Sequence, residues 1–476
     1  MRPARAPPRG PRIGPDVDLR RIFTAAWAPA NQAGAAVFAA ALLLTLAAAL
    51  FGGASQANAL SLMTVELASL PLLLVSLYQV LAGGAPRGVR VPLALLAAVV
   101  ALPLLQLIPL PAGVWSRLPG RGSVVDALGV AGLGRPSMPF SLTPAETWRS
   151  AMALAPPAAM FLGALLLSDG QRRMLAVCWL AVAVVSLLIG AMQMLSGADS
   201  ALYFYRITNA DSAVGLFANR NHQAALLFCL MPVAAVFAAR FRGDLRDRRA
   251  FAALLAALYL LAALAGVTAT RSRAGVMLAL FALAGAAAVL VRGGALSRHW
   301  RTAGGVAAAA LAVTAGVLLF GLAPILDRFD AGSSEPRFQN WPVVARAASD
   351  FLPLGSGVGS FQTVYSGVEP LGAVSPFYFN HAHNDYLEVW LETGLAGLAL
   401  AALFLGWLAT RIVAVWAGRA GEGDRDLAAG SSLSLLLLLG HSAVDYPLRT
   451  EALAVLFAFA CAVVAGYGRP EKALTP

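Results

Sequence analysis

Long apolar stretches constrain this chain more than any other feature of its sequence. A helix needs roughly 20 mostly apolar residues to cross a bilayer, because its backbone amides must find partners within the segment itself. About twelve stretches qualify, at residues 33–52, 60–83, 91–109, 150–168, 174–195, 223–239, 250–269, 274–291, 303–323, 388–410, 428–443 and 451–467. With 59% of residues hydrophobic and 12% charged, a water-soluble fold is excluded. We therefore predict an all-α, polytopic transmembrane helical bundle of about 12 spans.

The basic residues predict how these spans are oriented. Cytoplasmic loops of membrane proteins carry the excess of Arg and Lys. If the N-terminus is cytosolic, 23 of the 35 basic residues lie on the cytosolic side, including the cluster Arg240, Arg242, Arg246, Arg248 and Arg249. We predict cytosolic tails at residues 1–32 and 468–476, flanking a transmembrane domain at residues 33–467. This pattern also accounts for the formal charge of +11, so no nucleic-acid partner is expected.

Two of the predicted external loops are long enough to carry function, at residues 110–149 and 324–387. The second contains Arg337, Phe338 and Trp341, and later a further group of aromatic residues, Tyr365, Phe377, Tyr378 and Phe379. Aromatic rings with scattered Arg suit a surface that binds sugar or phosphate. We expect this loop to be partly helical and to be the ordered, functional one of the two.

The most unusual chemistry lies at the end of this loop. His381 and His383, two of the five histidines, stand beside Asn384 and Asp385, where polar sequence runs into an apolar helix. An imidazole has an unperturbed pKa of about 6.5 and can accept a proton at neutral pH. The sequence therefore points to chemistry at a membrane surface.

A glycine-rich turn precedes the histidines, with Gly355, Gly357 and Gly359 at alternate positions. Phosphate-binding loops require a preceding strand or a following Lys-Ser/Thr pair, and this segment has neither. We expect a tight backbone turn. The alternative is a turn that presents its amide groups to an anion.

Two further polar clusters lie at predicted helix starts. Residues 219–223 include Asn219, Arg220 and His222 and could bind a diphosphate at the helix N-terminus. An interfacial cap with Arg220 reaching lipid headgroups explains this run equally well. Arg271 and Arg273 occupy a short external turn, although basic residues normally concentrate in cytoplasmic loops. Their position therefore favours a functional role. The alternative is that they are placed by the dipole of the preceding helix or reach the interface.

The last external turn, residues 441–449, supplies His441, Asp445 and Arg449. We expect a structural role here, in which Asp445 pairs with an Arg from another loop; the alternative is that it orients a catalytic Arg. Three acids after the histidine pair share one helical face, and we expect the helix dipole to favour them there without a catalytic role: Asp385, Glu388 and Glu392.

These motifs together resemble the O-antigen ligase family over about residues 200–450. The resemblance is carried by Asn-Arg-Asn-His at 219–222, Ser-Arg-Ala-Gly at 272–275, the segment from Arg337 through Trp341 to Phe361, the run at 381–388 followed by Glu392 to Gly397, and the closing run at 441–449. Each motif is short, but their order is specific. The first half of the chain matches the family mainly in its pattern of spans.

The resemblance implies a glycosyltransferase of the bacterial inner membrane, with both termini cytosolic and its site on the periplasmic face. Such enzymes take a glycan from an undecaprenyl-diphosphate carrier. The acceptor is lipid A-core in ligases, another lipid-linked repeat in polymerases and a protein hydroxyl in some relatives. The family is thought to use neither a nucleotide sugar nor a metal ion, so no cofactor is expected.

The resemblance also assigns roles to residues. His383 is expected as the base that deprotonates the acceptor, with His381 as the second candidate. Four guanidinium groups are expected to bind the diphosphate: Arg220, Arg271, Arg273 and Arg337. Four residues are expected to support them: Asn219, His222, Asn384 and Asp445. Two His separated by one residue resemble half a metal site, but no Cys is near them, so no metal is expected.

Two other classes of protein remain open. A transporter of lipid-linked sugars would also have many spans, but it usually places ionisable groups at the membrane midplane, where this chain has only Glu66. A scaffold role remains possible for the first five spans. The sequence does not decide between ligase and polymerase, because both use the same donor.

Overall fold

The computed structural model describes residues 32–55, 57–83, 88–239, 248–293, 336–374, 379–418 and 424–468. Several predictions lie outside these ranges: the tail at 1–31 and 469–476, the ninth span at 303–323, the start of the second long loop, Phe377 and Tyr378, and most of the Arg240–Arg249 cluster. The side chain of Arg337 is also outside the described residues.

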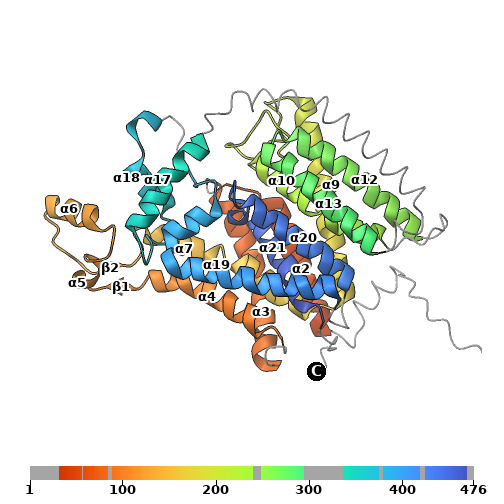
Figure 1. The fold of residues 1–476 in the computed structure, drawn as a ribbon, viewed down its shortest axis with the longest axis horizontal. Coiled ribbons are helices and arrows are strands. Elements are labelled where there is room, and N and C mark those ends of the chain that lie inside the picture. Colours follow the sequence, from red (N-terminus) through yellow and green to blue (C-terminus); the bar gives the residue numbers. More distant parts are fainter. Residues whose placement is uncertain are drawn as a thin grey trace, which may run out of the picture.

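The described chain is mostly helical (Figure 1). The apolar helices are α2 (Gln32–Phe51), α3 (Ala59–Gly83), α4 (Arg90–Gln106), α8 (Ala155–Leu166), α9 (Asp169–Ser196), α10 (Arg220–Cys229), α11 (Met231–Ala238), α12 (Arg248–Ala269), α13 (Arg273–Arg292), α19 (Asp385–Ala417), α20 (Arg425–His441) and α21 (Glu451–Gly466). They account for eleven of the predicted spans. The predicted sixth span is in fact two helices, because Pro232, the second residue of α11, cannot donate a backbone hydrogen bond to α10.

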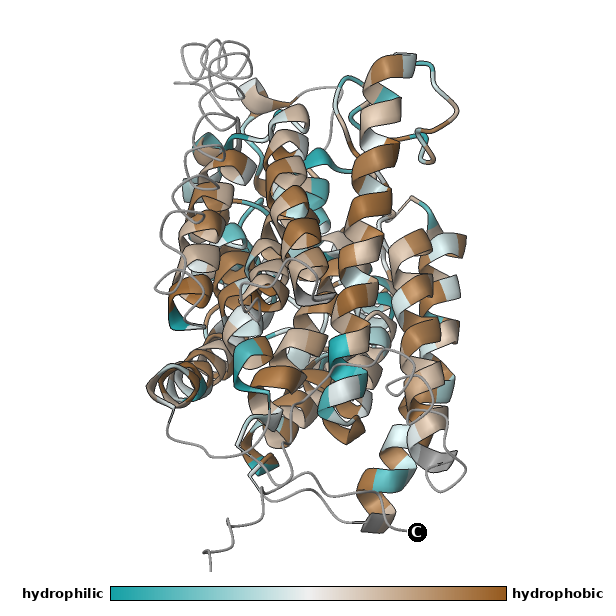
Figure 2. Ribbon diagram, turned by 90° about the vertical axis from the view of Figure 1, so that its right-hand side faces the viewer, coloured by the Kyte–Doolittle hydropathy of each residue, from teal (hydrophilic) through white to brown (hydrophobic). Residues whose placement is uncertain are grey.

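Eight helical segments within the described ranges are long and apolar enough to cross a membrane. Their outer faces expose large apolar side chains, such as Leu74, Phe281 and Leu403, each more than 60% exposed. Hydrophobic residues dominate these helices in Figure 2. The predicted class, an all-α polytopic membrane protein, is therefore confirmed, while the number of spans stays a prediction.

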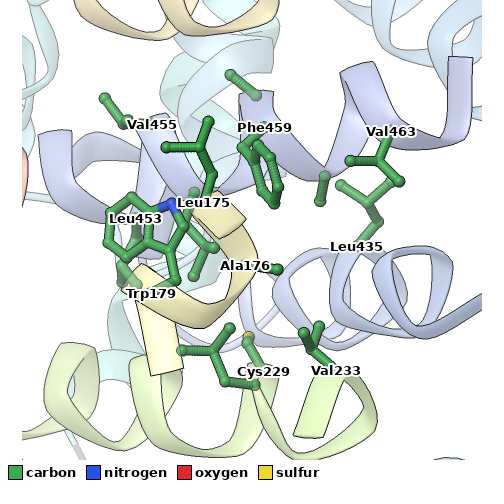
Figure 3. Close-up of a cluster of buried hydrophobic side chains, with 14 of the residues drawn as sticks. Leu175, Ala176, Trp179, Cys229, Val233, Leu435, Leu453, Val455, Phe459 and Val463 are labelled. Atoms are coloured by element: carbon green, nitrogen blue, oxygen red, sulfur yellow. The ribbon is translucent and has the colours of Figure 1, made fainter. Parts of the chain in front are cut away.

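A single large apolar core lies between these helices. Trp179 of α9 is fully buried and belongs to one cluster with Leu453 and Phe459 of α21 and with Cys229 and Val233 of the α10–α11 pair (Figure 3). The pair α10–α11 is buried over almost its whole length. The start of α10 is thereby held at a fixed place inside the bundle.

The two long loops meet at one end of the bundle. The first contains α5 (Ala112–Trp115), α6 (Gly122–Val130), α7 (Pro144–Met152) and a two-stranded sheet of β1 (Pro109–Leu110) and β2 (Met138–Pro139). The second contains α17 (Pro336–Asp350), α18 (Phe361–Val368) and the turn η3 (Leu371–Ala373), so its described part is partly helical, as predicted. The Leu142 amide donates to the Ser356 carbonyl at 3.0 Å, and the Thr147 hydroxyl donates to the Val358 carbonyl at 2.6 Å. Both loops project together at the left of Figure 1.

Candidate functional site

The helix after the histidine pair begins at a polar cap. The Asn384 side chain accepts hydrogen bonds from the Tyr386 and Leu387 amides at 3.0 and 3.1 Å. These amides have no partner within the helix, so an Asn at this position fixes the start of α19. Asn384 therefore supports the site by ending the histidine loop at a defined point.

Three carboxylates on one face of α19 surround a single guanidinium. Arg449, in the short helix η4 (Pro447–Arg449), lies 3.4 Å from Asp385, 3.2 Å from Glu388 and 3.0 Å from Glu392, measured between nitrogen and oxygen atoms. The acids are spaced i, i+3 and i+7, which places them along one face. The expectation that they merely favour the helix dipole was incomplete, because together they hold an arginine from the last turn.

Burial and neighbouring charges act in opposite directions on the pKa of Arg449. Burial would lower the pKa of Arg449, but the charges of Glu388, Glu392 and Asp385 raise it above its usual value. The guanidinium is thus a permanent cation. It joins the turn at residues 441–449 to the helix that follows the histidines.

The glycine-rich turn is held by the same helix. Glu392 accepts hydrogen bonds at one carboxylate oxygen from the Gly359 and Phe361 amides, at 3.0 and 3.3 Å. Its carbonyl oxygen accepts from the Gly357 amide at 2.9 Å. A tight turn was the expected structure, and its amides do meet an anion, the carboxylate of the protein's own Glu392.

A kink in α19 makes this contact possible. Gly394 has φ +56°, and a Cβ there would lie 2.3 Å from the Pro353 carbonyl oxygen. We expect Gly394→Ala to destabilise the protein by about 1–3 kcal/mol, since the left-handed backbone and the close approach both exclude a side chain. Thermal unfolding in detergent measures the change. Gly406→Ala is the matched control in the same helix, because nothing lies within 4 Å of its Cβ position; equal loss from both variants would contradict the role of the kink.

His381 is oriented by a carboxylate of α19. Its Nδ1 lies 2.8 Å from Glu388 Oε1, and the Ala382 amide donates to the other carboxylate oxygen at 3.0 Å. The imidazole side chain is only 8% exposed. Glu388 therefore serves both His381 and Arg449.

His383 forms a second pair of imidazole and carboxylate. Its Nδ1 lies 3.2 Å from Asp445 Oδ1, and its side chain is 16% exposed, twice the value for His381. Asp445 is fully buried and also accepts a hydrogen bond from Asn221. His383 has φ +51°, a left-handed conformation that His adopts more readily than most residues. Asp445 lies 3.2 Å from His383 and 4.0 Å from His441, and its expected pair with an Arg stays a prediction.

Tyr446 brings three histidines together. Its ring centroid lies 4.3 Å from that of His381, 4.9 Å from that of His383 and 5.0 Å from that of His222. Its hydroxyl accepts hydrogen bonds from the side-chain amides of Asn219 and Asn380, each at 3.3 Å. The polar run before α10 thus lies against the histidine loop, although more than 150 residues separate them.

Sequence reasoning did not assign a role to Tyr446 and left Arg449 without a defined partner. Both belong to the Asp-Tyr-Pro-Leu-Arg turn that the sequence had singled out. His222, named as a supporting residue, is buried and bonds Thr450 Oγ1 through Nδ1 at 2.7 Å.

Two of the three described diphosphate candidates lie at neighbouring helix starts. Arg220 is the first residue of α10, and Arg273 is the first residue of α13. The two helices approach closely, since a Cβ at Gly275 would lie 2.7 Å from the Ala224 Cβ. Ser272 caps α13 by accepting from the Gly275 amide at 3.0 Å. Both arginines are half-buried.

Arg271, the third described candidate, lies in the turn before α13 and has a carboxylate partner. It pairs with Asp211 at 3.4 Å, and both side chains are more than a third exposed. Burial would raise the pKa of Asp211, but hydrogen bonds, first that from Ser212, and the charges of Arg220 and Arg271 lower it. Asp211 therefore remains an anion between two of the candidate arginines.

Comparison with known families identifies part of the chain. Residues 258–402 match the family model described as O-antigen ligase. This segment is an O-antigen ligase domain. The match includes Arg271, Arg273, His381 and His383, and it ends before the turn that carries Asp445. A search of curated proteins finds no match.

The O-antigen ligase domain confirms the family resemblance drawn from the motifs. It marks an integral membrane protein of the O-antigen ligase and polymerase type, whose family members are glycosyltransferase-like enzymes of polysaccharide biosynthesis. Within the described ranges, no three His, Cys, Asp or Glu side chains are grouped to hold a metal ion. That the reaction needs no metal ion stays a prediction.

Proposed function

We propose that this protein transfers a glycan from an undecaprenyl-diphosphate carrier to an acceptor hydroxyl at the periplasmic face of the bacterial inner membrane. The observation that carries the proposal is the pair of His383 and Asp445 beside the start of α10. Asn219 donates a hydrogen bond to Tyr446, and Asn221 donates one to Asp445. Arg220 therefore stands between two residues that contact the partners of His383. A base and an anion-binding helix start are thus close neighbours.

In this proposal His383 accepts the proton of the acceptor. Its Nδ1–H donates to Asp445, which leaves Nε2 unprotonated and able to act as a base. The acceptor oxygen attacks the anomeric carbon, the bond from that carbon to the diphosphate oxygen breaks, and the proton moves to Nε2. Undecaprenyl diphosphate leaves, and a single displacement inverts the anomeric centre. His381 is the second candidate, but it is less exposed and its carboxylate partner is shared with Arg449.

Arg220 and Arg273 would stabilise the negative charge that develops on the leaving diphosphate. Guanidinium groups form charge-assisted hydrogen bonds to phosphate oxygens, and the amides at two helix starts add to this field. We assign Arg337 the same role from the family motif.

We expect Arg220→Ala and Arg273→Ala each to lower the rate of glycan transfer by about 10²–10³-fold, since each removes a charged donor from the reacting diphosphate. Arg271→Ala should have a smaller effect, because its side chain is open to solvent and paired with Asp211. Transfer is measured with purified, correctly inserted protein and a lipid-linked donor. Full activity in both Arg220→Ala and Arg273→Ala would show that the diphosphate does not bind at these helix starts.

The function itself is tested by the length profile of surface and lipid-linked glycan in cells with and without this protein, by gel and mass spectrometry. A ligase is supported if polymer is lost from its final acceptor while long chains accumulate on the carrier. Carriers that bear only single repeats would instead support a polymerase. An unchanged profile would reject both and favour the scaffold class.

A further inference from the structure

The first half of α17 lies against the histidine loop. The Trp341 indole Nε1 donates a hydrogen bond to the Ala382 carbonyl at 3.0 Å. Ala382 stands between His381 and His383, and consecutive Cα atoms are about 3.8 Å apart. Val344 and Ala347 on the buried face of α17, and Phe351 directly after the helix, pack in one cluster with Ala382. The position of Trp341 beside the loop is therefore fixed by the core of this region.

A second aromatic ring extends this contact outward. Phe338 packs edge to face on Trp341, with ring centroids 4.8 Å apart, yet 52% of its surface is exposed. The helix that carries it, α17, is not among the apolar spans found in the described residues. Gln339, the next residue in the chain, is also exposed and carries an amide side chain.

This mixture of groups matches the chemistry of a sugar. A pyranose ring has an apolar face of C–H groups that packs on an aromatic ring, and hydroxyls at its edge that need hydrogen-bond partners. Binding sites for such ligands combine aromatic surface with a few polar groups. An aliphatic surface would be expected for a lipid chain.

We infer that Phe338 and Trp341 form a platform that binds the acceptor glycan and presents its hydroxyl to His383. This inference rests on the proposed function. The donor diphosphate is assigned to the starts of α10 and α13, and Asn219 at the start of α10 reaches the histidine loop through Tyr446. The platform reaches the same loop from α17, which packs on α18 and α19 and lies apart from α10 and α13 in Figure 1. Donor and acceptor would therefore approach His383 from different sides.

The test compares Phe338→Ala, Phe338→Tyr and Phe204→Ala in the full-length protein. Phe204 is the matched control, a phenylalanine of equal exposure, 52%, in the segment before α10. The probes are delipidated core oligosaccharide and a single delipidated repeat unit of the surface polysaccharide of the same cells. Binding is measured by saturation-transfer NMR, and transfer kinetics are measured separately.

We expect Phe338→Ala to weaken binding of one probe and raise the acceptor KM by about fivefold to tenfold. The donor KM and kcat of Phe338→Ala should stay unchanged. Phe338→Tyr should bind the probe as well as wild type does, and Phe204→Ala should behave as wild type. Unchanged acceptor binding in Phe338→Ala, or a raised donor KM, would overturn the platform. Wild-type protein that binds a probe through Phe338 but transfers nothing would instead reject the proposed function and leave the glycan platform standing.

Discussion

Replacing His383 by alanine should lower the rate of glycan transfer by about 10²–10⁴-fold, the range expected when a general base is removed. The acceptor hydroxyl would then have to attack without losing its proton to the protein. The measurement is the initial rate of transfer from a lipid-linked donor, with protein that is shown by gel filtration to be folded. Added imidazole should restore part of the rate, because the vacated space lies next to the Asp445 carboxylate.

Two further variants separate a catalytic role from a structural one. Asp445→Asn should also lower the rate, since an amide can donate to Nδ1 and place the imidazole proton on Nε2, where the base must be free. His381→Ala should leave more activity than His383→Ala, because His381 is nearly buried and bound to Glu388. If His381→Ala were the inactive variant and His383→Ala were active, the assignment of the two imidazoles would be reversed.

Local signals in the sequence were enough to predict the helices. The start of α19 could be read from Asn384, a capping residue placed just before an apolar run. The apolar runs themselves predicted the apolar helices, because a bilayer leaves such a segment few alternatives to a helix. The break between α10 and α11 was missed, although Pro232 was visible, since residues 224–239 form one uninterrupted apolar run across it.

Contacts between distant segments could not be predicted in the same way. The spacing of Asp385, Glu388 and Glu392 showed that they share a face, but not that Arg449 would lie between them. Likewise, no local pattern placed Tyr446 among three histidines from different helices and loops. Such contacts depend on how the helices pack, and a single sequence carries no direct record of that packing.

The largest effect on stability is expected from Arg449. We expect Arg449→Met to lower the free energy of unfolding by about 3–5 kcal/mol, because three carboxylates of α19 would lose their shared cation in a buried place. Thermal unfolding in detergent, followed by tryptophan fluorescence, measures this loss. Arg271→Ala is the control: its pair with Asp211 is exposed to solvent, so its removal should cost only about 0–1 kcal/mol.

Neutralising the acids tests whether charge is the cause. In Arg449→Met combined with Glu388→Gln and Glu392→Gln, two of the uncompensated charges are gone, so part of the lost stability should return. The side-chain amide that Glu392→Gln introduces could still accept from the Gly359 and Phe361 amides through its carbonyl oxygen, which keeps the glycine-rich turn in place. A triple variant as unstable as Arg449→Met would mean that the arginine acts through packing. Recovered stability without recovered transfer would show that the charged network also positions His381.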